Sequence, residues 1–174
     1  MLHRNMRGAL TLGGMAILLG LMVGATAGVR AQIPKEPVKW SIKPASPDKP
    51  IQRGDSFTLQ LTATIEPGWH VYSTDQEEGG PTPTRIVLAP DQPFEQVGGI
   101  ASTEPKSTMD PNFNLLTQYY EGDATFTMTL KAAATAPSGK TDVKVNVTFQ
   151  TCSDQLCLPP KTVKLTAAVN ILAR

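Results

Sequence analysis

The sequence predicts an all-β domain, an antiparallel β-sandwich of the immunoglobulin-like type. Apolar and polar residues alternate in several segments after residue 31, which is typical of strands with one buried and one solvent-facing side. Proline and glycine separate these segments at short intervals. No segment after residue 31 shows the periodicity of an amphipathic helix.

The first half of the domain contains one strong and several weaker candidate strands. The strong candidate is SFTLQLTATI at 56–65, in which phenylalanine, leucine, alanine and isoleucine alternate with serine, threonine and glutamine. The segments 31–37 and 44–55 are rich in proline and lysine and are predicted to form an N-terminal arm with turns. The weaker candidates are VKWSIK at 38–43, WHVYS at 69–73, TRIVLA at 84–89 and FEQVG at 94–98.

The second half combines strong candidate strands with one region that lacks alternation. Residues 99–123 are predicted to form a long connection, either a binding or lid loop or a meandering loop with one irregular strand. The strong candidates follow: ATFTMTL at 124–130, DVKVNVTFQ at 142–150 and TVKLTAAVNI at 162–171. Together, the alternating segments predict a core that includes Phe57, Leu59, Leu61, Val145, Val147, Leu165 and Val169.

The first 31 residues have the organisation of a secretory signal peptide. Arg4 and Arg7 precede an uncharged, mostly apolar stretch that continues to Arg30, and the small residue Ala31 follows. We predict cleavage after Ala31, which makes residues 32–174 the exported domain. The alternative is an uncleaved membrane anchor, because about 20 apolar residues can cross a bilayer. Both interpretations place the domain outside the cytoplasm.

The charge of the predicted exported part argues against nucleic acid and anionic membranes as partners. Three of the 16 lysines and arginines lie in the leader, whereas all 15 acidic residues follow it. The exported part therefore carries 13 basic and 15 acidic residues, a net charge of −2, with no basic run. Such a chain lacks the cluster of lysine and arginine residues that binds the phosphates of nucleic acid. Its length is sufficient for one domain with its own core.

Both cysteines of the chain, Cys152 and Cys157, lie in FQTCSDQLCLPPK at 149–161. A structural zinc site takes about four ligands, whereas the exported part offers these two cysteines and His70. A c-type haem needs a Cys-x-x-Cys-His motif, which is absent. In an exported protein the pair is therefore expected to change between dithiol and disulfide. A redox couple and a local clamp both remain, although a clamp this short would contribute only about 2 kcal/mol.

The segment around the cysteines resembles the N-terminal periplasmic domain of the thiol:disulfide interchange protein DsbD. A valine-rich strand followed by TFQTCSDQLCLPPK carries most of the resemblance, and IEPGWHVYS at 65–73 and the final strand KTVKL add to it. The resemblance extends over residues 38–172. Four residues separate the two cysteines here, one fewer than in the best-known member of the family.

This resemblance implies a cap loop that shields Cys152 and Cys157, the redox pair. In MDPNFN at 109–114, it implies Phe113 as the aromatic tip of the cap and Asp110 as the acid before it. An apolar cap would keep the reactive thiolate away from stray disulfides until a partner arrives. The residues themselves also allow plainer roles, a core aromatic for Phe113 and a turn residue for Asp110.

His70 and Tyr72 match the strand that lies beneath the cysteines in this family. They alternate to the same face of the strand, where a polar group could hydrogen-bond to a sulfur, or where they form an ordinary half-buried pair. Trp69 points to the opposite face and is predicted to lie in the core. Pro159 and Pro160 lack N–H donors, which predicts an extended and unpaired segment, suited to partner docking or to ending a turn.

The resemblance favours a periplasmic thiol:disulfide interchange module with protein-disulfide reductase activity and no cofactor. It implies thioredoxin-like partners, with Cys157 as the cysteine that they engage. The membrane and thioredoxin-like domains of the family are not recognised in this chain, so a separate membrane electron transporter is expected. One alternative is a non-catalytic immunoglobulin-like module with a structural disulfide that binds another exported protein. The other is a Cu(I)-handling protein with Met109, Cys152, Cys157 and His70 as ligands.

Overall fold

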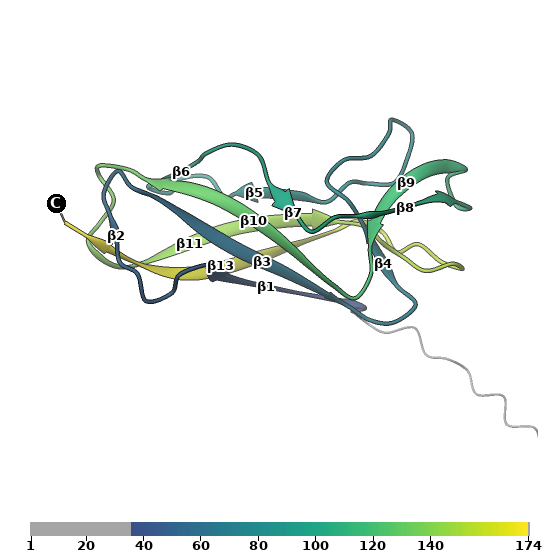
Figure 1. Cartoon of the computed structure of the whole chain (residues 1–174), viewed down its shortest axis with the longest axis horizontal. Coiled ribbons are helices and arrows are strands. Elements are labelled where there is room, and N and C mark those ends of the chain that lie inside the picture. Colours follow the sequence, from purple (N-terminus) through teal and green to yellow (C-terminus); the bar gives the residue numbers. More distant parts are fainter. Residues whose placement is uncertain (1–35, 174) are drawn as a thin grey trace, which may run out of the picture. The chain divides into compact units, whose positions relative to one another are not determined.

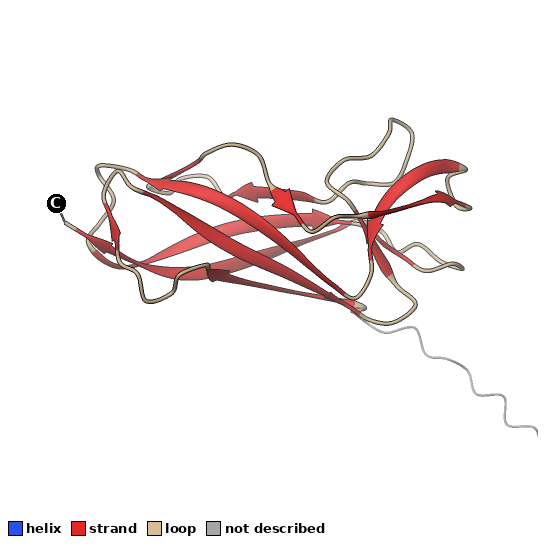
Figure 2. Cartoon of the chain, in the orientation of Figure 1, coloured by secondary structure: helices blue, strands red, loops and turns tan. Residues whose placement is uncertain are grey.

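The computed structural model describes residues 36–173, which fold into strands and loops without a helix (Figure 1, Figure 2). The prediction of an all-β domain is therefore confirmed. The predicted leader, residues 1–31, lies outside the described residues. Within the described part, no helix is present that could cross a membrane.

The first sheet is built around the long antiparallel pair of β3 (Ser56–Ile65) and β10 (Asp123–Ala132). β1 (Val38–Pro44) pairs with β3 on its other side. β6 (Phe94–Gln96) and β7 (Ala101–Ser102) both pair with β10 on its outer side. The predicted strand at 56–65 is confirmed with the same bounds, because its alternation is uninterrupted.

The second sheet is built around β11 (Gly139–Phe149) and β13 (Lys161–Leu172), which pair antiparallel along their whole length. β5 (Arg85–Leu88) pairs with β11. β2 (Ile51–Gln52) pairs in parallel with the end of β13. The segment 44–55, predicted to belong to an N-terminal arm with turns, thus contributes a short strand whose Ile51 joins the core.

Side chains from the facing sides of these two sheets form the hydrophobic core of a sandwich. Five of the seven residues predicted for the core are buried: Leu59, Leu61, Val145, Val147 and Val169. The other two, Phe57 and Leu165, are half-buried and pack against the core. The alternation therefore predicted the inward face of each strand correctly, and only the depth of burial differs.

A third sheet, which we call the end sheet, lies at the end of the sandwich away from the C-terminus (Figure 1). Its order is β12 (Thr151–Cys152), β4 (His70–Tyr72), β9 (Leu115–Tyr120) and β8 (Lys106–Asp110), and all its pairs are antiparallel. A single residue separates β11 from β12, and two residues separate β9 from β10. Both larger sheets thus fix the position of the end sheet.

The prediction for residues 99–123 was wrong in its main feature. This region is not a long connection but contains β7 and the hairpin of β8 and β9. β8 has no apolar alternation because it is an edge strand whose first four residues are exposed. β9 has apolar residues on both faces, so its sequence LLTQYY gives no period of two.

Candidate functional site at the end sheet

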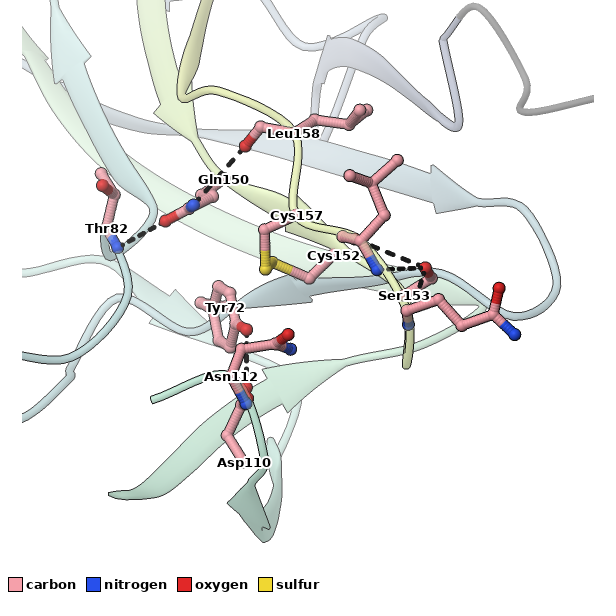
Figure 3. Close-up of a disulfide and its surroundings, with 11 residues drawn as sticks. Tyr72, Thr82, Asp110, Asn112, Gln150, Cys152, Ser153, Cys157 and Leu158 are labelled. Carbon is pink, nitrogen blue, oxygen red and sulfur yellow. Dashed lines mark hydrogen bonds between the residues drawn. A yellow bond between two sulfur atoms is a disulfide. The ribbon is translucent and has the colours of Figure 1, made fainter. Parts of the chain in front are cut away.

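The two cysteines form a disulfide at the edge of the end sheet (Figure 3). Cys152 lies on β12, is fully buried and pairs with His70 of β4. Cys157 is half-buried and follows a tight loop. In that loop the Ser153 N–H donates to the Leu156 carbonyl at 2.8 Å, and the Ser153 hydroxyl accepts the Leu156 N–H at 3.2 Å. The disulfide therefore has one buried sulfur-bearing residue and one that is partly open to solvent.

The segment after Cys157 is held against the end of the sandwich. The Leu158 N–H donates to the Thr151 carbonyl at 2.9 Å. Gln150 bridges this segment to a distant loop, because its side chain donates to the Leu158 carbonyl at 3.5 Å and accepts the Thr82 N–H at 2.9 Å (Figure 3). Pro159 and Pro160 are exposed and lie outside any strand. The loop that carries Cys157 is thus fixed at both ends.

His70 and Tyr72 lie on the face of the end sheet that carries Cys152. Their rings are 5.1 Å apart, as their alternation predicts. Tyr119 of β9 pairs with Tyr72, and its ring lies 5.2 Å from His70. Trp69 is buried in the sandwich core, in agreement with its predicted orientation. We call the surface formed by Cys152, His70, Tyr72 and Tyr119 the site face.

A hydrogen bond between two buried side chains links the site face to the β8–β9 hairpin. The Tyr72 hydroxyl donates to the Asp110 carboxylate at 2.6 Å (Figure 3). Tyr72 is fully buried and Asp110 is 3% exposed. Burial and this hydrogen bond raise the pKa of Tyr72, so the phenol stays protonated and remains the donor. Asp110 also accepts the Asn112 N–H at 2.8 Å, within the turn at the tip of the hairpin.

The tip of the β8–β9 hairpin, residues 111–114, turns back towards the site face. The Asn114 N–H donates to the Asp110 carbonyl at 2.8 Å, and Asn114 adopts a left-handed conformation with φ 54°. Asparagine tolerates this conformation better than most residues do. The half-buried Phe113 places its ring edge-to-face with Tyr72, 5.9 Å between centroids. The structure therefore brings Phe113, Asp110 and Tyr72 together.

A small pocket of 60 Å³ opens where the hairpin tip, the site face and the cysteine loop meet. Most of its lining residues are polar, and they come from all three parts: His70, Thr108, Asp110, Pro111, Asn112, Tyr119, Glu121, Ser153 and Asp154. A pocket of this size and polarity has room for bound water. Burial lowers the pKa of His70, while Asp110, Glu121 and Asp154 oppose that change. The imidazole is therefore neutral at neutral pH.

Sequence reasoning missed Tyr119, Glu121 and Asp154 as members of this site. Tyr119 was hidden in the region assigned to a loop, and only the register of β9 with β4 shows that it meets His70. Glu121 and Asp154 carry no motif of their own. The four residues considered as Cu(I) ligands do not share one face. Met109 is 62% exposed and points to the face of β8 opposite to that of Asp110. Among residues 36–173, no group of three or more His, Cys, Asp or Glu is arranged to hold a metal.

Residues 42–168 match the family described as thiol:disulfide interchange protein DsbD, N-terminal. The chain belongs to this family. As a DsbD N-terminal domain it has an immunoglobulin-like fold, and the family predicted from the cysteine segment is confirmed. The roles predicted for individual residues of the site stay predictions.

Solved structures align with this DsbD N-terminal domain at low sequence identity. The N-terminal periplasmic domain of ScsB from Proteus mirabilis aligns with a TM-score of 0.49 and 20% identity, over 78% of this chain and 48% of that one. The chain thus spans about half the length of that structure. The major pilin subunit BcpA of Bacillus cereus aligns with a TM-score of 0.42 and 9% identity, over 76% of this chain and 40% of its own. No curated protein sequence matches the chain significantly.

Proposed function

We propose that this DsbD N-terminal domain is an exported electron relay, in which Cys152 and Cys157 exchange electrons with thioredoxin-like proteins of the periplasm. In this proposal residues 1–31 are the leader and 32–174 the working domain. A separate membrane electron transporter supplies or receives the electrons, and the domain itself needs no cofactor. Phe113 and Asp110 serve as the cap, and His70 and Tyr72 support the cysteines from the site face.

The placement of the disulfide is the observation that carries this proposal. Cys152 is fully buried on β12, whereas Cys157 is half-buried beside an exposed, proline-rich segment. A partner thiol or disulfide needs access to one sulfur only, because the second step is intramolecular. A clamp between two structural elements has no need of such asymmetry. The geometry thus supports Cys157 as the cysteine that partners engage and Cys152 as the resolving cysteine.

The exchange reaction follows from these two roles. In the reducing direction the Cys157 thiolate attacks one sulfur of an oxidised partner, a mixed disulfide forms, and the partner's other sulfur leaves as a thiolate. The Cys152 thiolate then attacks the Cys157 Sγ, the Cys152–Cys157 disulfide forms, and the second partner sulfur leaves. Two electrons and two protons pass from the module to the partner. The oxidising direction is the reverse of these steps.

A pair of matched serine variants tests the two roles. We expect Cys152→Ser to accumulate a mixed disulfide with a purified, oxidised periplasmic thioredoxin-like protein, because Cys157 remains and the module has no second thiol to resolve the bond. Cys157→Ser should accumulate little, since the buried Cys152 is hard for a partner to reach. Non-reducing electrophoresis followed by mass spectrometry of the linked peptides measures both.

Two results would contradict the relay. If the mixed disulfide accumulated only with Cys157→Ser, Cys152 would be the cysteine that partners engage and Cys157 the resolving cysteine. Failure of both variants, together with a reduction potential below about −300 mV for the Cys152–Cys157 disulfide, would identify a structural bond. The domain would then be a binding module with a clamped loop.

A further inference from the structure

The resolving cysteine needs a proton acceptor inside the protein. Cys152 is fully buried, so bulk water does not reach its side chain. Burial disfavours the charged form of any thiol, yet the thiolate is the species that attacks. A neighbouring base is the usual solution, as in other activated cysteines.

His70 is the group on the site face with the right position and a free lone pair. It pairs directly with Cys152 across β12 and β4. Side chains of directly opposite residues lie on the same face with Cβ atoms about 5 Å apart, within reach of an imidazole and a thiol. Within residues 36–173 the imidazole makes no hydrogen bond, so its ring nitrogens are available.

The other polar groups of the site face are less suited to accept this proton. Asp110 already accepts the Tyr72 hydroxyl at 2.6 Å and the Asn112 N–H at 2.8 Å. Tyr72 donates its hydroxyl proton to Asp110 and has a raised pKa. Tyr119 presents a phenol, whose oxygen is a much weaker base than an imidazole nitrogen. Among these residues His70 alone combines a neutral base with a position opposite Cys152.

Charged groups around His70 favour the imidazolium once it forms. Asp110 faces it from the hairpin, Glu121 from the end of β9 and Asp154 from the cysteine loop. Lys106 of β8 forms a 2.7 Å ion pair with Glu121. Burial keeps the resting imidazole neutral by lowering its pKa, and the carboxylates oppose this effect. The environment thus holds His70 ready to accept a proton and stabilises the product of the transfer.

We propose that His70 is the proton acceptor of the Cys152 thiol and thereby sets the rate at which the module resolves its mixed disulfides. The proposal rests on the relay function. In the mixed disulfide with a partner, the Cys152 proton passes to His70, the Cys152 thiolate attacks the Cys157 Sγ, and the bond between Cys157 and the partner breaks. The departing partner thiolate takes the proton from His70. The pocket beside His70 has room for water that carries this proton.

The thiolate population of Cys152 tests the proposal directly. Cys157→Ser leaves Cys152 as the one thiol of the chain, and the ultraviolet absorbance of its thiolate is titrated against pH. Adding His70→Phe keeps an aromatic ring against Tyr72 and Tyr119 but removes the acceptor. We expect His70→Phe to raise the midpoint of the Cys152 titration by about one pH unit or more, relative to Cys157→Ser alone. About tenfold less thiolate is then present at neutral pH.

Two further variants keep this test specific. His70→Gln lacks a nitrogen that accepts a proton at neutral pH and should produce the same upward shift. Tyr120→Phe removes a phenol that is bonded to Ser102, outside this pocket, and should leave the midpoint unchanged. An unchanged midpoint in both His70 variants, with normal unfolding curves in urea, would overturn the proposal.

A small disulfide probe separates this proposal from the relay itself. The reduced module, with both cysteines present, reacts with dithiobis-nitrobenzoate and releases two coloured thiolates, the first by attack of Cys157 and the second by attack of Cys152. His70→Phe should slow the second release about tenfold at neutral pH and less at alkaline pH, and leave the first unchanged. A normal second release refutes the role of His70 whatever the partner trapping shows. A slowed second release with failed partner trapping refutes the relay alone.

Discussion

Tyr72 and Asp110 join two parts of the molecule through a hydrogen bond between buried side chains. A buried carboxylate is costly unless donors satisfy its oxygens. Here one oxygen receives the Tyr72 hydroxyl and the other the Asn112 N–H, so the carboxylate is paired on both sides. The pair therefore fixes the tip of the β8–β9 hairpin against β4.

Removal of the Tyr72 hydroxyl should loosen this connection. We expect Tyr72→Phe to lower the free energy of unfolding by about 1–3 kcal/mol, because one oxygen of a buried carboxylate loses its donor. Urea unfolding monitored by tryptophan fluorescence measures the change. Tyr120→Phe is the matched control, since the Tyr120 hydroxyl is bonded to Ser102 at 2.8 Å, away from the hairpin tip. A smaller loss for Tyr72→Phe than for Tyr120→Phe would contradict the importance of the pair.

For individual residues, the sequence predicts which side chains share a face of one strand. It does not predict the contacts that depend on how strands pair with one another. His70 and Tyr72 share a face because residues two apart on a strand always do. The contact of Tyr72 with Asp110 crosses 38 residues and depends on how the hairpin returns to β4. Tyr119 entered the site for the same reason, through the pairing of β9 with β4. Neither pairing leaves a pattern in the local sequence.

The β8–β9 hairpin is the element that decides access to the disulfide in the proposed relay. Its tip contacts the site face through the half-buried ring of Phe113, and β8 has no strand on its outer side within the described part. An edge hairpin with an exposed outer face opens at less cost than a central strand would. Substitutions at the hairpin tip should therefore change access to the disulfide, whereas substitutions in the sandwich core should change the free energy of unfolding.

Phe113→Ala should expose the cysteines without unfolding the domain. We expect alkylation of the reduced thiols to become several-fold faster, while the free energy of unfolding falls by less than about 2 kcal/mol, because the ring is only half-buried. Mass spectrometry after timed alkylation gives the rates, and urea unfolding gives the stability.

Phe94→Ala provides the matched control for the cap. Phe94 is 7% exposed on β6 and packs edge-to-face with Phe57 in the sandwich. Its loss should cost about 3–5 kcal/mol and leave the alkylation rate of the folded protein unchanged. If Phe113→Ala instead behaved like Phe94→Ala, Phe113 would be a core aromatic and the cap would be formed by other residues.

Some strands can be predicted from the sequence and others cannot, because only some have a regular alternation of buried and exposed residues. Strands β3, β10, β11 and β13 each have one buried and one exposed face, so a period of two is visible. β8 is an edge strand whose only buried residue is Asp110, and a buried carboxylate is not part of any apolar pattern. β2 and β12 have two residues each, too few for a period to appear.

In the described domain as a whole, the hydrophobic core and the disulfide are separate. The buried cluster is formed mainly by the two larger sheets and includes Val71 and Tyr120 of the end sheet, but neither cysteine. The disulfide closes a local loop at the edge of the end sheet and joins no strands of the two larger sheets. This separation is what a relay requires, because the module must stay folded in its oxidised and its reduced state.

Reduction of the disulfide should therefore leave the fold intact. We expect the reduced domain, and the double variant Cys152→Ser with Cys157→Ser, to keep the circular dichroism of the oxidised form and to lose only about 2 kcal/mol of stability, the value for closing so short a loop. Urea unfolding with and without reductant measures the difference. Leu61→Ala gives the scale of a true core change, since Leu61 is fully buried in the sandwich and its truncation should cost about 2–5 kcal/mol. A reduced domain that unfolds, or that loses more stability than Leu61→Ala does, would show that the disulfide supports the fold, and a domain that unfolds in half of its cycle could not carry electrons.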